Sequence, residues 1–468
     1  MNMQQKALII NTSYAKAYKN AKVRTAVPSL PPLTIAALAA SLEREGIETK
    51  VLDLNIEKDQ EKAVNDTITE FEPTHVSVSF TTNSFNDMNT ICKEARAIDK
   101  NIFLIGGGTH ASYYPKETLQ QSLLDVAVAG EGDLSFPRIV KGDNLNEIAG
   151  IAFRNAQGEI IVNAQDGYMK DLDILPFPAW HLFDIKKYKV SKLISRRRPV
   201  GPLETSRGCL FSCTYCTKSV FGQTWRYKSA NRVVQEIENM VDVGFKEFHV
   251  VDDMFTTNKE RAKDICRQMI DKKIPIVYNL RNGIRVNSVD EELVKLLAES
   301  GGYRASFGIE SGNQKVLNGI LKGVKIEQVR SAMKLFKQYG IERLGFFMFG
   351  LPDDTEQSMQ ETIDFALELD PEIAKASIST PFPGTPLYEI YQKKGLLLTD
   401  DWDKFMTHDP KAVYRHPIMD WETIYEYYSK FYKAFYLRPE YAMRRLVYGF
   451  RYGTLFADIQ SFFKTDWN

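Results

Sequence analysis

Residues 207–216 read Arg-Gly-Cys-Leu-Phe-Ser-Cys-Thr-Tyr-Cys, so Cys209, Cys213 and Cys216 fall within eight residues. Three thiols with the spacing C-x3-C-x2-C on one loop can converge on a single soft-metal centre. Structural zinc usually takes four protein ligands, and this loop has no fourth Cys or His, the nearest histidines being His181 and His249. A zinc ion with three protein ligands stays open, although all-thiolate ligation is unusual for catalytic zinc. An iron–sulfur cluster normally has four cysteine ligands, so three would leave one iron free to bind another molecule.

The cysteine loop follows the first strand of a repeating strand–helix series. Apolar β-rich runs predict strands at residues 203–206, 247–251, 277–280, 303–307, 344–349 and 376–378. Helical spacing of apolar residues predicts helices at residues 231–241, 259–272, 291–300, 326–339 and 356–367. Six strands of this kind predict a partial or complete βα barrel, whose active site forms at the carboxyl ends of the strands.

A second βα series precedes the barrel. Apolar strands are predicted at residues 7–10, 49–52, 75–79, 102–105 and 126–129, with helices at 33–44, 61–71 and 85–98 between them. Wholly apolar strands alternating with helices indicate a doubly wound parallel sheet, which binds ligands at the carboxyl ends of its strands. Small and polar residues occupy three of those loops: Thr81, Thr82, Asn83 and Ser84; Gly106, Gly107, Gly108, Thr109 and His110; Gly130, Glu131 and Gly132. These loops favour a ligand site, although each glycine alone is equally typical of a tight turn.

Two further regions complete the chain. Residues 151–154 and 160–162 flank Asn-Ala-Gln-Gly, which predicts a hairpin, and the Leu-Pro-Phe-Pro run at 175–178 predicts an extended connection. Residues 421–468 hold 16 of the 54 aromatic residues, which favours helices packed on the barrel over an apolar substrate entrance or weak membrane contact. The expected divisions are residues 1–145, a linker at 146–195, the barrel at 196–400 and a helical C-terminal segment at 401–468.

Composition excludes several classes of protein. The chain has 468 residues, with 60 Lys and Arg against 60 Asp and Glu, and this balance argues against a nucleic-acid partner held by phosphate neutralisation. The longest apolar stretch, residues 33–42, is about half of the ~20 residues that a membrane span needs. No signal-peptide pattern begins the chain, and five cysteines do not suggest a secreted disulfide framework. We therefore expect a protein of the reducing cytoplasm.

The cysteine spacing, with Tyr215 just before the last cysteine, resembles the C-x3-C-x-aromatic-C signature of the radical S-adenosylmethionine (SAM) superfamily. The resemblance implies a [4Fe–4S] cluster on Cys209, Cys213 and Cys216, with its free iron chelating the methionyl amine and carboxylate of SAM. One electron, from a donor such as flavodoxin or ferredoxin, would then cleave SAM to methionine and a 5′-deoxyadenosyl radical. The barrel is accordingly expected to be a partial (β/α)6 TIM-type barrel.

Later motifs match the same superfamily in order along the barrel. They are Asp252-Asp253 after the second strand, Arg285 after the third, a Gly-x-Glu-Ser segment ending the fourth, a Gly-Phe-Phe-Met-Phe-Gly segment in the fifth, and a Thr-Pro-Phe-Pro-Gly segment after the sixth. The resemblance implies contacts with SAM from Tyr215, Asp252, Asp253, Arg285, Gly308, Glu310, Ser311, Phe349 and Pro381.

The first domain resembles the Rossmann-like cobalamin-binding domain fused to one large radical SAM class, on residues 31–39, 106–111 and 129–133. The resemblance covers roughly residues 6–400. It departs from other cobalamin proteins because the D-x-H-x-x-G motif is absent, so cobalamin would be held without a histidine below cobalt. It implies cobalamin contacts from Thr81, Thr82, Asn83, Gly107, Gly108, His110, Gly130, Glu131 and Gly132. His110 is equally well explained as an ordinary loop histidine.

The leading hypothesis is a cobalamin-dependent radical SAM methyltransferase acting on an unactivated carbon or phosphinate of a small molecule. One SAM would methylate cobalamin and a second would supply the radical that abstracts hydrogen from the substrate. A first alternative is an oxidative cyclase or rearranging enzyme for a tetrapyrrole or lipid, with or without cobalamin. A second is a non-enzymatic corrinoid or iron–sulfur carrier, against which the Gly-x-Glu-Ser and arginine motifs argue.

Overall fold

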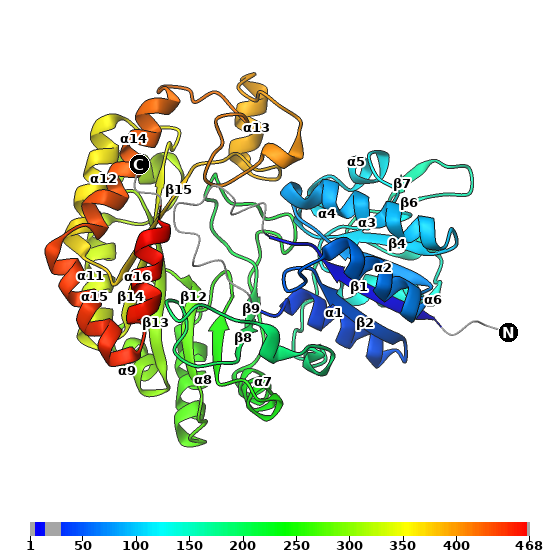
Figure 1. Cartoon of the computed structure of the whole chain (residues 1–468), viewed down its shortest axis with the longest axis horizontal. Coiled ribbons are helices and arrows are strands. Elements are labelled where there is room, and N and C mark those ends of the chain that lie inside the picture. The colour runs from blue at the N-terminus through cyan, green and yellow to red at the C-terminus, as the bar shows by residue number, and fades with distance from the viewer. Residues whose placement is uncertain (1–4, 15–29, 466–468) are drawn as a thin grey trace.

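The computed structural model describes residues 5–14 and 30–465, and it places an N-terminal α/β domain beside a half-open βα barrel (Figure 1). The parallel strands of the first sheet run in the order β2 (Glu48–Asp53), β1 (Lys6–Asn11), β3 (His75–Ser79), β4 (Phe103–Gly107) and β5 (Val126–Val128). Its helices are α1 (Leu33–Arg44), α2 (Gln60–Phe71), α3 (Phe85–Ile98), α4 (Thr109–Tyr113), α5 (Pro115–Gln120) and α6 (Gly132–Lys141).

The two faces of this sheet are covered by different helices, which confirms the doubly wound prediction. Alternate residues of β1 point to opposite sides: Leu8 packs in the cluster formed with α2 and α3, whereas Ile9 packs in the cluster formed with α1 and α6. Because both faces of the central strands are covered, successive residues of β1 are apolar and buried, whereas the edge strand β2 carries polar residues.

A hairpin extends the same sheet at its β5 edge. Strands β6 (Ile151–Arg154) and β7 (Ile160–Val162) pair antiparallel, and Ala152 lies opposite Ala127 of β5. The hairpin was predicted, but its segment was assigned to the linker, and the structure instead joins it to the N-terminal sheet. Antiparallel pairing needs no crossover helix, so a short segment after α6 can reach the open edge directly. The domain boundaries themselves stay a prediction.

The barrel is a six-stranded parallel sheet in the order β15 (Ile373–Ile378), β14 (Glu342–Phe349), β13 (Gly302–Glu310), β12 (Val277–Ile284), β11 (Glu247–Val250) and β8 (Val200–Leu203). Its helices are α7 (Ala230–Val243), α8 (Lys259–Asp271), α9 (Glu291–Glu299), α10 (Gln314–Gly319), α11 (Ile326–Gln338), α12 (Glu356–Leu369) and α13 (Pro386–Lys393). Strands β8 and β15 end the order, and no pairing joins them in the described residues. The partial-barrel prediction is therefore confirmed.

The first barrel strand differs from the prediction. It covers residues 200–203, and the predicted 203–206 stretch instead leads into a separate strand β9 (Ser206–Arg207). This strand pairs antiparallel with β10 (Arg226–Tyr227), with Arg207 opposite Arg226. The two short strands thus join the ends of the loop that carries the cysteines.

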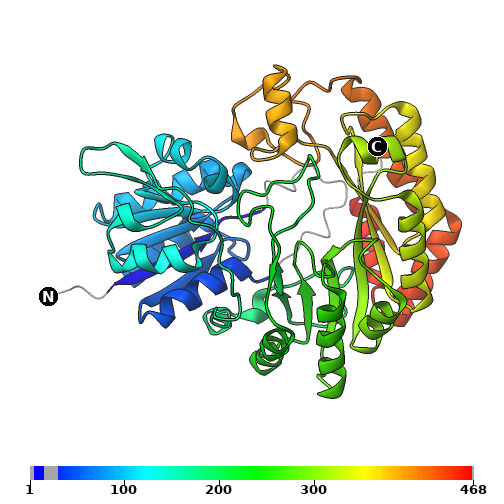
Figure 2. The ribbon, with the colours of Figure 1, turned by 180° about the vertical axis from the view of Figure 1, so that it is seen from behind.

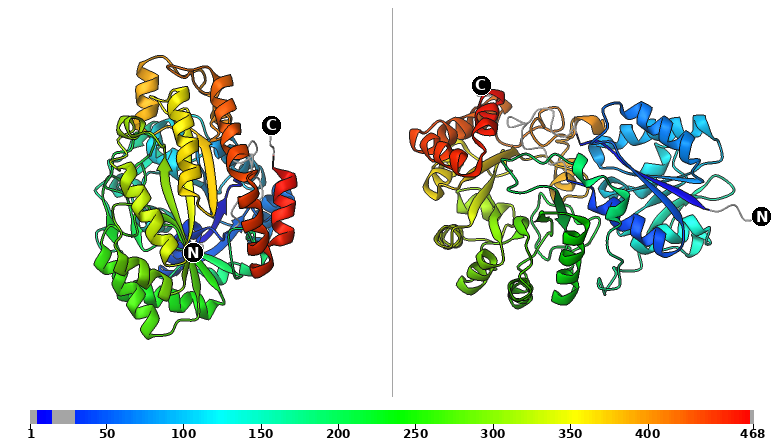
Figure 3. Two further views of the ribbon diagram at one scale, coloured as in Figure 1. Left: turned by 90° about the vertical axis from the view of Figure 1, so that its left-hand side faces the viewer. Right: turned by 60° about the horizontal axis from the view of Figure 1, so that its bottom comes forward.

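Three C-terminal helices lie on the side of the barrel away from the N-terminal domain (Figures 2 and 3): α14 (Trp421–Tyr436), α15 (Pro439–Tyr452) and α16 (Leu455–Lys464). The Tyr432 hydroxyl of α14 accepts a hydrogen bond from the Ala376 N–H (3.0 Å) and donates one to the Ala376 carbonyl (3.1 Å). The helix is therefore fixed to β15, as the prediction of helical packing requires. In the described residues, no helix is both long and apolar enough to span a bilayer.

Candidate functional site

The cysteine loop is fixed by contacts from distant parts of the barrel. The Thr214 N–H donates to the Ile320 carbonyl (3.1 Å), and the Leu387 N–H donates to the Thr214 carbonyl (2.9 Å). At the start of the loop, Gly208 has φ +85°, and a Cβ there would lie 2.3 Å from the Thr224 carbonyl oxygen. Only glycine allows this close approach of the two ends of the loop. Within the loop, Cys213 is buried, Cys209 is half-buried and Cys216 is exposed.

Two cations, the buried Arg285 and the half-buried Lys322, lie beside the cysteines. The Arg285 guanidinium stacks on the Phe211 ring at 3.3 Å from its centroid, and it donates to the Gly323 carbonyl at 3.0 Å. Burial lowers the pKa of Arg285 from its ordinary value, and the nearby sulfur atoms of Cys213 and Cys209 oppose that shift. The second cation is Lys322, whose charge acts on Cys216. These cations would offset the negative charge that deprotonated thiols bring to the loop.

Lys322 belongs to a three-residue network at the end of β13. Its ammonium donates to Glu310 Oε1 (2.7 Å) and to the Tyr215 hydroxyl (3.0 Å), and that hydroxyl donates to the same Glu310 oxygen (3.0 Å). Gly308 lies directly beneath this pair, because a Cβ there would lie 2.6 Å from Glu310 Oε1 and 2.9 Å from Lys322 Nζ and would displace the ends of both side chains. Glu310 itself has φ +66°, an unusual conformation for a residue with a side chain. The structure therefore brings together Tyr215, Arg285, Gly308 and Glu310 from separate motifs.

The two aspartates after β11 have different surroundings. Asp252 is buried and accepts hydrogen bonds from the Thr205 N–H, the Thr205 hydroxyl and the Ser206 hydroxyl, each at 2.6 Å. Burial raises the pKa of Asp252 to about 6 against these bonds. Asp253 is exposed and accepts from the Gly208 N–H at the start of the cysteine loop. Asp252 therefore anchors the chain before the loop, and of the two only Asp253 is open to a ligand.

The other predicted SAM contacts are divided. Ser311 is buried, and its hydroxyl lies 3.1 Å from the Thr362 hydroxyl of α12. Phe349 packs on Phe431 of α14 and is fully buried, so the structure does not bring it to the cysteines. Pro381 is also buried, in the segment after β15. That segment reaches the loop further on, because a Cβ at Gly384 would lie 2.8 Å from the Thr217 hydroxyl.

The three thiols are ligands of the type that a soft-metal cluster takes, although they are not arranged closely enough to hold a single metal ion. In residues 5–14 and 30–465, no three His, Cys, Asp or Glu side chains are close enough together to hold a metal ion. The loop nevertheless offers three cysteines beside two cations, and the adjacent carboxylate of Glu310 is paired with Lys322. Thiolates are the ligands of iron–sulfur clusters, so this donor set fits such a group.

A cavity of about 340 Å³ lies at the carboxyl ends of the N-terminal strands. Six of the predicted residues line it: Thr81, Gly107, Gly108, Gly130, Glu131 and Gly132. Gly108 has φ +128°, and a Cβ there would lie 2.1 Å from the Phe80 carbonyl oxygen. The opposite wall is formed by residues around the cysteine loop, among them Arg207 and Phe221. The cavity therefore lies between the N-terminal sheet and the segment that carries the cysteines.

Thr82, Asn83 and His110 do not line this cavity. The buried His110 ring has Nδ1 3.2 Å from the Thr82 hydroxyl and packs against Phe85 and Trp402, with centroids 5.0 and 5.1 Å away. Burial lowers the pKa of His110 to about 4, so the ring is neutral at pH 7. The side chain belongs to an aromatic cluster under the loop.

A buried ion-pair network joins the two domains across the cavity. Arg207 donates to Glu131 (2.9 Å), Asp133 (2.7 Å) and Glu204 (2.8 Å), and Arg226 donates to Glu131 (2.8 Å). Burial alone would raise the pKa of Asp133, but the Arg207 guanidinium overrides it and holds that pKa below its ordinary value. Sequence reasoning did not predict roles for Asp133, Arg207 or Lys322. Arg207 was adjacent to the motif, but nothing in the local pattern indicated its partners.

Comparison with known proteins matches both halves of this site. A model of the B12 binding domain matches residues 20–140, and a model of the radical SAM superfamily matches residues 203–366. An uncharacterized methyltransferase, PH0819, of Pyrococcus horikoshii is 35% identical over 417 residues, which cover 88% of each chain. The chain belongs to the radical SAM superfamily. Within that superfamily it is one of the members with a B12-binding domain before the barrel.

Other relatives are named as methyltransferases or as cyclases. The cytidylyl-2-hydroxyethylphosphonate methyltransferase of Streptomyces wedmorensis is 29% identical, over 94% of this chain and 91% of that protein. An anaerobic magnesium-protoporphyrin IX monomethyl ester cyclase of Cereibacter sphaeroides is 28% identical, over 86% of this chain and 67% of that protein. Among solved structures, the radical SAM methyltransferase TsrM of Kitasatospora setae, with cobalamin and a [4Fe–4S] cluster bound, has the same fold. Its TM-score is 0.69 at 20% identity, over 90% of this chain and 86% of that chain.

Proposed function

We propose that this radical SAM enzyme is a cobalamin-dependent methyltransferase acting on an unactivated carbon or phosphinate of a small molecule. The observation that carries the proposal is that the cysteine loop forms part of the wall of the cavity in the B12-binding domain. Arg207, just before the loop, and Phe221, within it, both line that cavity. A group held in that cavity would lie next to a group held by the cysteines. Such adjacency suits a reaction that uses both cofactors on one substrate.

The proposed cofactors would be held by residues of the barrel. Cys209, Cys213 and Cys216 would hold a [4Fe–4S] cluster, and SAM would bind beside Glu310 and Arg285. A carboxylate suits the methionyl amine, and a guanidinium suits a carboxylate by charge-assisted hydrogen bonding. When bound, the cofactors supply one-electron cleavage of SAM and a transferable methyl group. The chain's own task is to hold and orient them and to exclude competing reactions.

The N-terminal cavity fits a group held without a protein ligand to its metal. Gly107, Gly108 and Gly130 form part of its lining without side chains, and the buried His110 does not face it. Ser77 and Ser79, on the same face of β3, add hydroxyl groups to the lining. We propose that cobalamin binds here through its corrin and tail rather than through a histidine below cobalt.

Cofactor content tests the sites first. Anaerobically purified and reconstituted protein is expected to contain about four iron atoms per chain and cobalt at a near-equimolar amount. A Cys213→Ala variant should lose iron and keep cobalt, whereas Cys266→Ala, which removes a buried thiol of the barrel core, should keep both. Iron retained at the wild-type level in the Cys213 variant would refute the assignment of the cluster.

Product analysis then tests the reaction. With dithionite or a reduced flavodoxin or ferredoxin, SAM labelled in its methyl group and a pool of candidate metabolites, a methyltransferase yields both S-adenosylhomocysteine and 5′-deoxyadenosine. The label appears in a new small molecule. 5′-Deoxyadenosine formed without S-adenosylhomocysteine would contradict methyl transfer and favour a cyclase or rearranging enzyme. The similarity to the magnesium-protoporphyrin cyclase is the specific observation behind that second candidate.

A further inference from the structure

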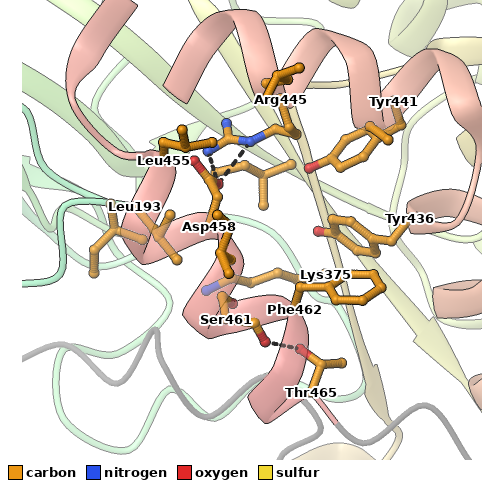
Figure 4. A pocket seen from close by; sticks show the side chains of 15 residues that line it. Leu193, Lys375, Tyr436, Tyr441, Arg445, Leu455, Asp458, Ser461, Phe462 and Thr465 are labelled. Atoms are coloured by element: carbon orange, nitrogen blue, oxygen red, sulfur yellow. Dashed lines mark hydrogen bonds and ion pairs between the residues drawn. The ribbon is translucent and has the colours of Figure 1, made fainter. Parts of the chain in front are cut away.

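A second cavity, of about 280 Å³, lies at the open seam of the barrel, apart from the cysteine loop and the N-terminal cavity (Figure 4). Its walls come from the start of β15, from residues 193 and 194 just before β8, and from helices α14, α15 and α16. Because β8 and β15 do not pair in the described part of the chain, helix α16 covers the gap that a complete barrel would close with strands.

The lining is mainly apolar, and one of its few polar groups has no partner in the described residues. Leu193, Ile373, Leu455 and Phe462 form much of the wall (Figure 4). Lys375, on the same face of β15 as Ile373, extends into this space. In residues 5–14 and 30–465, no hydrogen-bond acceptor and no carboxylate is paired with its ammonium group. Lys375 is half-buried among these apolar side chains, and an unpaired ammonium in such surroundings favours a ligand that supplies the missing charge.

The other polar groups of the lining are already used within the protein. Asp458 accepts from Arg445 Nε at 3.1 Å and from the Thr454 hydroxyl at 2.8 Å. The Tyr436 hydroxyl donates to the Ala374 carbonyl (2.6 Å), and the Tyr441 hydroxyl donates to the Glu372 carbonyl (3.2 Å).

The charges that surround Lys375 are positive. Burial, together with the guanidinium groups of Arg281 and Arg304, lowers the pKa of Lys375 to about 8, so most of the amine is still protonated at pH 7. Arg304 is paired with Glu342 at 2.5 Å, and the half-buried ring of His408 has its pKa lowered to about 4 by burial and by the charge of Lys375. The charges that act on Lys375 are positive, so a ligand with a negative charge would offset them.

We propose that the seam cavity binds an amphipathic acid, with a phosphate or carboxylate headgroup on Lys375 and its alkyl chain against α16 and Leu193. The volume of about 280 Å³ lies just below the range of ~300–1,000 Å³ for small-molecule pockets, which fits a single chain of moderate length. Helix α16 also has apolar side chains that are exposed to solvent, Phe456 and Phe463.

Calorimetric titration of the full-length reconstituted protein, without SAM, tests the site independently of the proposed methyl transfer. Octyl phosphate is the probe, with octanol and inorganic phosphate as comparisons. We expect one octyl phosphate per chain, weakened about tenfold or more in Lys375→Met, because a charge-assisted hydrogen bond is lost. Octanol binding should be unchanged in that variant. Lys334→Met, which removes an exposed lysine of α11, is the matched control and should bind like the wild type.

A second variant tests the apolar part of the cavity. Leu193→Trp should fill the space and weaken octyl phosphate and octanol alike, with the folded state verified by an unchanged circular dichroism spectrum. Co-sedimentation with phosphatidylcholine vesicles containing phosphatidic acid, lost in Lys375→Met, would identify a membrane lipid as the source of the ligand. Binding of soluble octyl phosphate without vesicle binding would identify a free metabolite. The proposal is overturned if octyl phosphate does not bind, if Lys375→Met binds it as tightly as the wild type, or if inorganic phosphate binds equally well.

Discussion

Replacement of Arg207 by Met should destabilise the protein far more than loss of a surface ion pair, because one carboxylate is left without a partner. Of the three carboxylates that Arg207 contacts, Glu131 keeps Arg226, and the side chain of Glu204 is 17% exposed and can be hydrated. Asp133 is 7% exposed, and Arg207 is the only partner with which it forms an ion pair in the described residues. Removal of one member of a buried pair costs about 3–5 kcal/mol of unfolding free energy.

The pH dependence of this loss gives a second signature. In the wild type the pKa of Asp133 is below its ordinary value, so the pair stabilises the folded state above about pH 4 and this contribution is lost only as pH falls further. Without Arg207, burial should raise the pKa of Asp133, and the folded state should lose stability as pH rises through that raised value. The difference between wild type and Arg207→Met is therefore expected to widen from about pH 5 to about pH 8.

Urea denaturation at the two pH values measures the effect. Arg330→Met is the control, because Arg330 pairs with Glu368 on the surface and should cost no more than about 1 kcal/mol. The double variant Arg207→Met with Asp133→Asn removes the orphaned charge and should recover part of the loss. The reasoning is refuted if Arg207→Met costs no more than the control, or if its cost does not change with pH.

Four further predictions follow from particular contacts. Gly308→Ala should lower reductive cleavage of SAM while keeping iron content, because its Cβ would lie 2.6 Å from Glu310 Oε1 and would displace that carboxylate; unchanged 5′-deoxyadenosine formation would contradict this. Tyr432→Phe should cost about 1–3 kcal/mol in urea denaturation, since two backbone groups of β15 lose a buried partner. Tyr427→Phe should have little effect, because the hydroxyl of this half-buried residue of α14 donates to the exposed carboxylate of Glu356 at 3.4 Å. His110→Phe should keep cobalt, and loss of cobalt with an intact fold would contradict the buried role. Burial holds the pKa of His110 at about 4 in the folded state, so the wild type should lose unfolding free energy as pH falls from about 6.5 to about 4. The variant should lack this part of the pH dependence. Lys322→Met should lower SAM cleavage and leave the Tyr215 hydroxyl bonded to Glu310; wild-type turnover would show that the ammonium is dispensable.

The regular elements were predictable wherever burial imposes a pattern. Strand β3 and helices α1 and α3 have the predicted residues at both ends. The alternating valines of β3 and the helical spacing of apolar residues in α1 and α3 mark the positions that the fold buries. Strand β8 was placed three residues late, since it contains Gly201 and Pro202, which are rare inside strands. Its glycine has a tertiary cause: a Cβ there would lie 2.5 Å from the Met240 side chain of α7.

The site was predictable only where residues are close in sequence or belong to a superfamily motif. Cys209, Cys213 and Cys216 share one loop, and Glu310 and Arg285 lie in recognisable segments. Lys322 lies in a loop after α10, and its position beside Glu310 depends on how that short helix folds back over the end of β13. Asp133 looks like an ordinary acidic residue in the first turn of α6 until Arg207 is seen beside it.

The anchors of the cysteine loop connect it both to the N-terminal domain and to the barrel. Arg207 stands two residues before Cys209, and its partners Glu131 and Asp133 belong to the N-terminal domain. Within the barrel, the loop's Thr214 is bonded to Ile320 and Leu387, which follow the fourth and sixth strands. Strand pairing in the barrel involves none of these contacts, so the barrel sheet can keep its register while the loop shifts. A change in how the B12-binding domain docks should therefore alter the arrangement of the thiols before it alters the barrel itself.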